Sequence, residues 1–147
     1  MTCTTKNEQI EDLKVKLLAI GGNRVSPQPD PHIDIVLARG RAFETKGRKR
    51  LRDELHRCHT VAALYYARHY ALGHGGTCEI CTGYALSDNG MWRPHSWAWD
   101  GRRVIEPNIE PVLYFGTILN TEEAGHFVIG QVLSSLPYYT SGEWRDA

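Results

Sequence analysis

The sequence predicts an α+β fold in which N-terminal helices, one of them carrying a cysteine, pack on a small antiparallel sheet and a last helix closes the chain. Helical periodicity dominates the first half, and alternating runs separated by turn residues dominate positions 78–119 before a final helical pattern. The chain has 147 residues, of which 41% are hydrophobic. This is the size of one domain with its own core, so we expect a single domain over residues 1–147.

Helical patterns occupy three segments. Residues Asn7–Ile20 carry apolar side chains at near-helical spacing, and Gly21 stops the run. Cys58–Leu72 is the clearest helix, because its apolar positions fit one buried face and several glycines follow it. Thr121–Leu133 forms the third, with Thr121 as its candidate N-cap.

The sequence patterns between the first two helices predict secondary structure less clearly. Val25–Pro31 holds three prolines and indicates a loop. Ile33–Ala42 fits either a short helix or an extended segment. Thr45–Arg52 is a basic run, which we interpret as a solvated connection although it could contact phosphate.

Strand patterns follow the cysteine helix. Cys78–Leu86 alternates between the two faces of a strand, and Val112–Leu119 is a further β-rich run. Two short runs, His95–Asp100 and Arg102–Glu106, are joined by Asp100-Gly101, a strong hairpin signal because a type I′ turn needs positive φ at both central residues.

This hairpin places a histidine near a carboxylate. With Asp100 and Gly101 at the centre of the turn, His95 faces Glu106, with Cβ atoms about 4.5–5.5 Å apart. A three-residue loop would break this register. A Glu that accepts a hydrogen bond from a His ring fixes its tautomer and favours the imidazolium, which is the base-and-acid half of a catalytic triad. An ordinary cross-strand surface pair is the alternative interpretation.

The surroundings favour the catalytic interpretation of this pair. Trp92, Trp97 and Trp99 flank His95, and we expect them to form a dry wall beside it. A low dielectric strengthens a charge pair and shields an acyl intermediate from water.

Cys58 is the candidate nucleophile. It lies at or near a helix start, where free N–H groups and the helix dipole lower a thiol pKa. A buried, inert helix cysteine is the alternative. The neighbouring His59 is a possible supporting residue but points about 100° away along a helix, so we expect it to be poorly placed as a base. The other candidate bases considered besides His95 are His56, His69 and His74.

The order of these residues resembles that of the papain-like superfamily, including transglutaminase-like domains. The local motifs also resemble those of a poorly characterised group of small bacterial and phage proteins, which have the pattern G-Y-A, H-A-W, D-G-x-V-x-D-P-T and Y-F-G after a helix-start cysteine. The matching segments lie within residues Leu55–Gly116 and are Gly83-Tyr84-Ala85, Pro94-His95-Ser96-Trp97, Asp100-Gly101, Val104-Ile105-Glu106-Pro107 and Tyr114-Phe115-Gly116.

The resemblance implies Cys58 as nucleophile, His95 as base and Glu106 as orienting acid. Three positions depart from the pattern. Glu106 stands where Asp is usual, Asn108 stands where Thr is usual and is the fallback third member, and Val61 stands where Asn is expected. The implied activity is thiol-dependent acyl transfer through a thioester, released by water (peptidase, amidase or deamidase) or by an amine (transglutaminase or acyltransferase). The implied substrate is a protein or peptide-like molecule, and the chemistry needs no cofactor.

Two other functions remain open. A non-catalytic protein-binding module on a degenerate cysteine-enzyme fold is one, and the Val61 departure fits it. The other is a zinc site, because Cys78 and Cys81 have ligand spacing and His74 precedes them, with His59 or Cys58 as a further ligand. Against zinc, continued alternation would put the two cysteines of the pair on opposite faces of a strand.

The charge balance and the hydropathy of the sequence argue against two classes of partner, nucleic acids and membranes. Lys and Arg number 17 and so do Asp and Glu, a balance that does not favour a nucleic-acid partner outside the local run 45–52. The apolar stretch Val15–Ile20 is too short to span a bilayer, and Met1–Asp12 lacks a signal-peptide core. We therefore expect a cytoplasmic protein with no membrane partner. The sequence does not indicate an oligomeric state.

Overall fold

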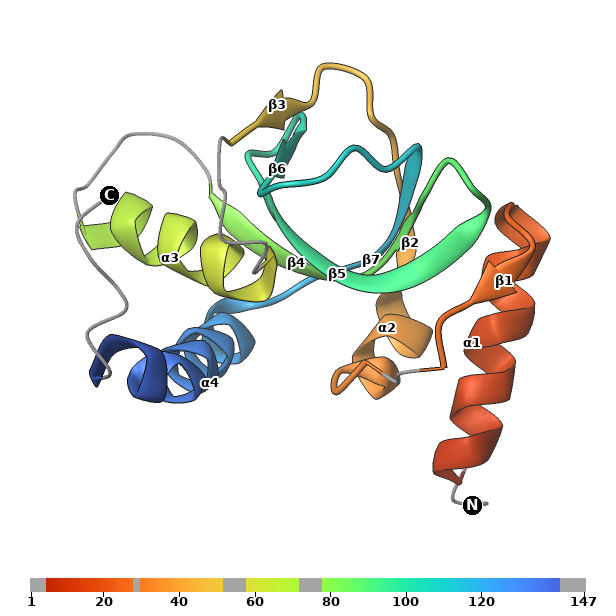
Figure 1. Cartoon of the computed structure of the whole chain (residues 1–147), viewed down its shortest axis with the longest axis horizontal. Helices are drawn as coiled ribbons and strands as arrows, with labels where there is room; N and C mark the ends of the chain where they lie inside the picture. Colours follow the sequence, from red (N-terminus) through yellow and green to blue (C-terminus); the bar gives the residue numbers. More distant parts are fainter. Residues whose placement is uncertain (1–4, 28–29, 52–57, 72–77, 141–147) are drawn as a thin grey trace.

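The computed structural model describes residues 5–27, 30–51, 58–71 and 78–140, and within them the predicted α+β class is confirmed (Figure 1). The described helices are α1 Lys6–Ile20, α2 Ile33–Arg39, α3 Cys58–Ala71 and α4 Thr121–Thr140. The described strands are β1 Arg24–Val25, β2 Arg41–Phe43, β3 Lys49–Arg50, β4 Glu79–Leu86, β5 Met91–Trp99, β6 Val104–Glu106 and β7 Leu113–Ile118.

The strands form one curled seven-stranded sheet in the order β2-β7-β4-β5-β6-β3, with β1 attached to β5. The central pairings are antiparallel, but β1 runs parallel to β5 and β3 runs parallel to β6. The prediction of a purely antiparallel sheet was therefore wrong at its margins. The parallel strands are Arg24–Val25 and Lys49–Arg50, which are too short to show any alternation in sequence.

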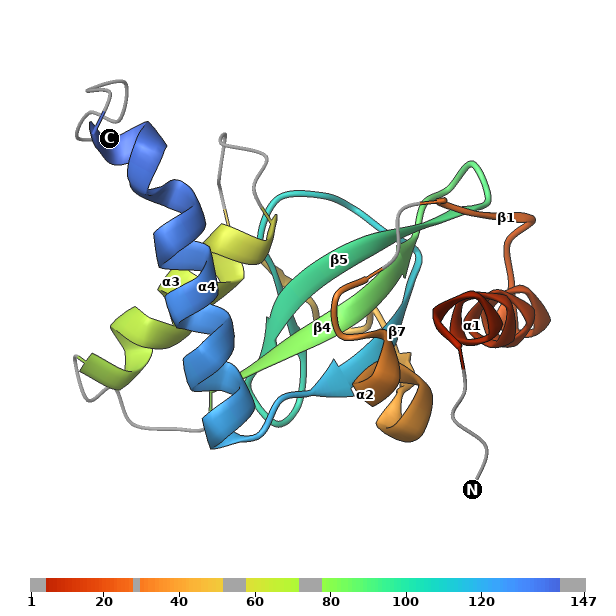
Figure 2. The same ribbon diagram turned by 90° about the horizontal axis from the view of Figure 1, so that it is seen from below.

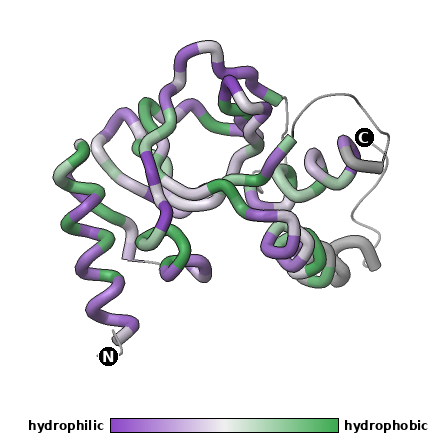
Figure 3. The backbone as a smooth tube through the Cα atoms, turned by 180° about the vertical axis from the view of Figure 1, so that it is seen from behind, coloured by the Kyte–Doolittle hydropathy of each residue, from purple (hydrophilic) through white to green (hydrophobic). Residues whose placement is uncertain are grey.

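The helices gather at two ends of the sheet. In both views α3 and α4 lie together at one end, whereas α1 lies at the other end with α2 nearer the middle (Figures 1 and 2). Hydrophilic and hydrophobic residues alternate along α1 (Figure 3), and its buried residues Leu13 and Leu17 pack with Trp92 of β5. A second cluster joins α3 to α4 through Ala63 and Phe127.

Local signals explain most element boundaries. Thr5 caps α1 through a capping box with Glu8. The undecided segment 33–42 is part helix and part strand, divided at Gly40. The helix α4 is capped by Asn120 rather than by Thr121, since Asn120 exchanges hydrogen bonds with Glu123, and it continues past the expected end to residue 140. No helix in the described part of the chain is long and apolar enough to cross a bilayer.

The outer edge of β5 is paired only at its two ends among the described strands. Residues 91–92 pair with β1 and residues 98–99 pair with β6, so residues 93–97 pair with β4 alone. The helix α3 contacts β5. The candidate site is built where the first residues of α3 meet this middle segment.

Two paired glycines allow β4 and β7 to approach each other closely beside the middle of β5. Gly83 of β4 and Gly116 of β7 are direct cross-strand partners. A Cβ atom on Gly116 would lie 2.3 Å from the carbonyl oxygen of Thr82 and 2.8 Å from the Trp97 ring. The strands approach so closely here that only glycine fits.

Replacing Gly116 by alanine is expected to lower the free energy of unfolding by about 1–3 kcal/mol, because the added methyl group would be too close to its neighbours. Gly125→Ala is the matched control, because nothing lies within 4 Å of a Cβ atom there and α4 continues through it. Alanine at that helical position should raise the free energy of unfolding by about 0.5–1 kcal/mol. Urea denaturation of both variants measures the difference, and equal effects would contradict the close packing.

Candidate active site

His95 and Glu106 form a buried ion pair on the inner face of the curled sheet. The Nε2 atom of His95 lies 2.8 Å from Oε1 and 3.1 Å from Oε2 of Glu106. Both side chains are almost completely excluded from solvent. The predicted contact between these two residues is therefore present.

The hairpin reaches this contact by a different register from the predicted one. Trp99 pairs with Val104, so the loop spans residues 100–103 instead of two central residues, and the expected pairing of His95 with Glu106 was wrong. Asp100 stabilises the longer loop, because its Oδ1 accepts hydrogen bonds from the backbone N–H groups of residues 102 and 103. Continuing the register sets Glu106 opposite position 97. The shift is two positions, so Glu106 keeps its sheet face and reaches His95 diagonally.

The Glu106 carboxylate has further donors besides His95. Its Oε1 accepts from the Tyr114 hydroxyl at 2.7 Å, and its Oε2 accepts from the backbone N–H groups of Asn108 and Ile109 at 2.8 and 3.0 Å. Burial raises the pKa of Glu106, but the hydrogen bond and charge of His95 together with the two backbone N–H groups outweigh burial and hold the pKa below its ordinary value. The carboxylate therefore stays ionised at neutral pH.

Sequence reasoning missed the residues behind this carboxylate. Arg48 donates to the Tyr114 hydroxyl at 3.2 Å and to the carbonyl oxygen of Pro111 at 2.6 Å. Arg48 is partly buried, so the interpretation of its basic run as a solvated connection was wrong at this position. Tyr114 lies within one of the matching motifs, which is the signal that could have identified it. Arg48 has no comparable signal.

Cys58 is the first described residue of α3, and its thiol is hydrogen-bonded to the rings of His95 and His59. Burial raises the pKa of Cys58, but these hydrogen bonds and the positive charge of the imidazoles outweigh it and lower the pKa to about 5. Burial lowers the pKa of His95, but the hydrogen bonds and negative charges of Cys58 and Glu106 outweigh it and raise the pKa to about 9. Both shifts favour a thiolate–imidazolium pair at neutral pH.

His59 lies closer to the thiol than we expected from its helical position. It approaches from the other face of β5, where its Nδ1 lies 2.5 Å from the Ser96 hydroxyl. Ser96 donates to Thr82 at 3.0 Å, and Thr82 donates to the fully buried Asp30 at 3.5 Å. Because the Ser96 hydroxyl donates onward, it accepts from Nδ1–H of His59, which leaves the Nε2 side of that ring for its contact with the Cys58 thiol.

The tryptophans are divided between the two faces of the sheet. The Trp97 and Tyr114 rings stack near His95, with centroid distances of 6.1 and 6.2 Å and interplanar angles of 23° and 29°. Trp92 points to the opposite face, where its Nε1 donates to the carbonyl oxygen of Gly21. Trp99 packs on Phe43. The predicted dry wall therefore consists of Trp97 and Tyr114.

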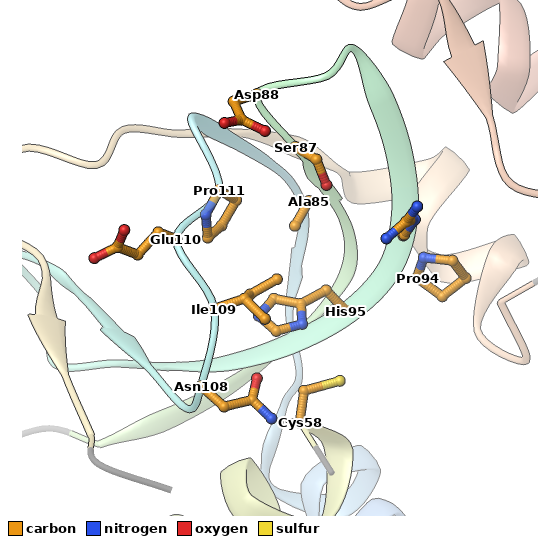
Figure 4. A pocket seen from close by; sticks show the side chains of 11 residues that line it. Cys58, Ala85, Ser87, Asp88, Pro94, His95, Asn108, Ile109, Glu110 and Pro111 are labelled. Atoms are coloured by element: carbon orange, nitrogen blue, oxygen red, sulfur yellow. The ribbon is translucent and has the colours of Figure 1, made fainter. Parts of the chain in front are cut away.

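A pocket of about 450 Å³ opens over the thiol and the imidazole (Figure 4). Cys58 and His95 lie on one side of this pocket, the loop from Asn108 to Pro111 lies on another, and the β4–β5 turn with Asp88 lies on a third. The pocket is lined by Cys58, Ala85, Ser87, Asp88, Arg93, Pro94, His95, Asn108, Ile109, Glu110 and Pro111. A substrate in this pocket would meet the thiol directly.

The residues proposed as zinc ligands do not gather in the described structure. Cys81 is buried in the sheet core among apolar residues, and burial raises its pKa well above the ordinary value. Cys78 precedes β4, and burial with the charges of Asp100 and Glu79 raises its pKa to about 11. His74 lies outside the described residues, as does His56. Among the described residues, no three His, Cys, Asp or Glu side chains are grouped as metal ligands would be.

Comparisons with protein-family models, with curated proteins and with solved structures found no match to this chain.

Substituting the buried carboxylate tests how strongly it holds this region. Glu106→Gln keeps the volume but loses the charge, and its amide nitrogen cannot accept the hydrogen bonds that one carboxylate oxygen now accepts. We expect a loss of about 2–3 kcal/mol in the free energy of unfolding. Glu110→Gln, which removes an exposed ion pair with Arg50, should cost less than about 1 kcal/mol. Similar losses in both variants, measured by urea denaturation, would argue against Glu106 as an anchor.

Proposed function

We propose that this chain is a thiol-dependent acyl-transfer enzyme with a papain-like or transglutaminase-like active centre. Cys58 is the nucleophile, His95 moves the proton and Glu106 orients His95. One observation carries the proposal: a partly buried thiol hydrogen-bonded to an imidazole, which is paired with a buried carboxylate, at a pocket large enough for a peptide side chain.

The proposed first step forms a thioester. The Cys58 thiolate adds to the carbonyl carbon of an amide, and the C=O π electrons move to the oxygen. The tetrahedral species collapses, the C–N bond breaks, and the leaving nitrogen takes the proton from the His95 imidazolium. Glu106 keeps the His95 ring oriented and stabilises its positive charge before the proton leaves.

The proposed second step releases the acyl group. His95, now neutral, takes a proton from water or from an amine as that molecule adds to the thioester carbonyl. Collapse breaks the C–S bond, returning Cys58 to the thiolate and His95 to the imidazolium. Water gives a carboxylic acid, and an amine gives a new amide, so the same residues serve hydrolysis and transfer of a protein or peptide-like substrate.

The apolar wall supports this charge separation. Trp97 and Tyr114 are fully buried beside the His95 ring. Electrostatic attraction between thiolate and imidazolium is stronger in such surroundings than in water. A thiol must be ionised to act as a nucleophile, and pairing with an imidazolium favours that ionised form near neutral pH.

Covalent labelling tests the nucleophile. Iodoacetamide at about pH 6.5 should alkylate the wild-type chain at Cys58, because a thiol with a pKa of about 5 is ionised there. Cys58→Ala should lose this labelling, whereas Cys78→Ala should keep it, since Cys78 has a pKa of about 11. Intact-mass spectrometry gives the stoichiometry. Equal labelling of wild type and Cys58→Ala would reject the proposal and favour a non-catalytic binding module.

The pH dependence tests the ion pair. The alkylation rate should rise through about pH 5 to a plateau as the thiolate forms, whereas acyl transfer should also fall above about pH 9, where His95 loses the proton that the leaving group needs. In His95→Ala the rise in alkylation should move toward the ordinary thiol value near 9.0. A wild-type profile that rises only near this ordinary value would contradict a preformed pair.

A further inference from the structure

We propose that the side-chain amide of Asn108 is the oxyanion donor of this site: its Nδ2–H₂ group donates to the oxygen that becomes negative when Cys58 adds to a carbonyl. The inference rests on the proposed function and deepens it. It gives Asn108 a different role from the fallback third member of the triad, because Glu106 occupies that place against His95.

Asn108 lines the same pocket as Cys58 and His95. In Figure 4 its amide nitrogen is turned toward Cys58 and its carbonyl oxygen is turned away. A carbonyl group bonded to the Cys58 sulfur would lie in the pocket that this amide also lines.

The amide is also free. The described residues give the Asn108 side chain no hydrogen bond, and its Oδ1 atom is buried without a partner. The Nδ2–H₂ group therefore has no acceptor among the described residues and is available to a substrate oxygen, whereas the Oδ1 atom is itself an acceptor and is not paired by that contact. The two imidazoles nearby already have partners, since His95 is hydrogen-bonded to Glu106 and Cys58, and His59 is hydrogen-bonded to Ser96 and Cys58.

The amide is held in place before substrate arrives. The backbone N–H groups of Asn108 and Ile109 both donate to Oε2 of Glu106, whose other oxygen holds His95. One rigid carboxylate therefore fixes both the proton carrier and the loop that carries the donor. Preorganised donors of this kind stabilise developing charge without reorganisation.

The experiment compares two reactions of the same thiol. Acylation by p-nitrophenyl acetate passes through an oxyanion, in which the thiolate adds to the ester carbonyl, the C=O electrons move to oxygen, and collapse expels p-nitrophenolate and leaves acetyl-Cys58. Alkylation by iodoacetamide displaces iodide in one step and forms no oxyanion. Asn108→Leu keeps the approximate shape of the side chain and removes the donor, and Asn7→Ala is the control at an exposed position of α1.

We expect Asn108→Leu to slow release of p-nitrophenolate by about 10²-fold while its alkylation rate stays within about 2-fold of wild type. Asn108→Ala should behave in the same way, and Asn7→Ala should match wild type in both reactions. Unfolding curves and the alkylation rate together show whether each variant retains the folded site.

Other outcomes overturn the inference. Acylation at the wild-type rate in both Asn108 variants would leave Cys58 as nucleophile and reject Asn108 as donor. Equal slowing of acylation and alkylation would mean that Asn108 only positions the thiol or maintains the fold. If acylation of the wild-type chain does not depend on Cys58, the proposed function and the oxyanion donor both fail.

Discussion

The arrangement of the site depends on one buried carboxylate. Glu106 is fully excluded from solvent, and an unpaired carboxylate there would be strongly destabilising. Its oxygens accept from an imidazole, a phenol and two backbone N–H groups, so its charge is distributed over donors from β5, β7 and the loop after β6. The carboxylate therefore fixes the His95 ring and one wall of the pocket at the same time.

A second constraint brings the thiol to this carboxylate. The middle of β5 pairs on one side only among the described strands, and α3 approaches its open edge. Adjacent residues of α3 can therefore reach opposite faces of β5. Cys58 meets His95 on the inner face, and His59 meets Ser96 on the outer face. Elements far apart in sequence meet because strand pairing is incomplete at this point.

Many of the helices and strands could be predicted from the sequence, because hydrophobic periodicity and the residue preferences of turns are local properties. The extents of α1 and α3, the long strands β4 and β7, and the hairpin at Asp100 follow from such patterns. The short parallel strands could not be predicted, since two residues carry no period and their partners lie elsewhere in the chain. The inward turn of Arg48 within a basic run likewise depends on a tertiary partner, Tyr114.

The error in the hairpin register shows why the site prediction nevertheless placed the pair correctly. Sheet faces alternate with a period of two, so a shift by two positions preserves the face and changes only the offset along the strand. A diagonal neighbour lies about 7–8 Å away, compared with about 5 Å for a direct one. The longer side chain of Glu106 spans that distance. Aspartate, which is usual in the resembling pattern, is one methylene shorter.

The two imidazoles at the thiol differ in their second hydrogen-bond partner, which is a carboxylate for His95 and a hydroxyl group for His59. His95 has a carboxylate at 2.8 Å, so a positive charge on its ring is neutralised inside the protein. His59 has a serine hydroxyl, and the nearest carboxylate along its hydrogen-bonded chain, Asp30, is reached only through Ser96 and Thr82. His95 therefore has the adjacent counterion that a protonated ring needs, which agrees with its role as proton carrier in the proposed mechanism.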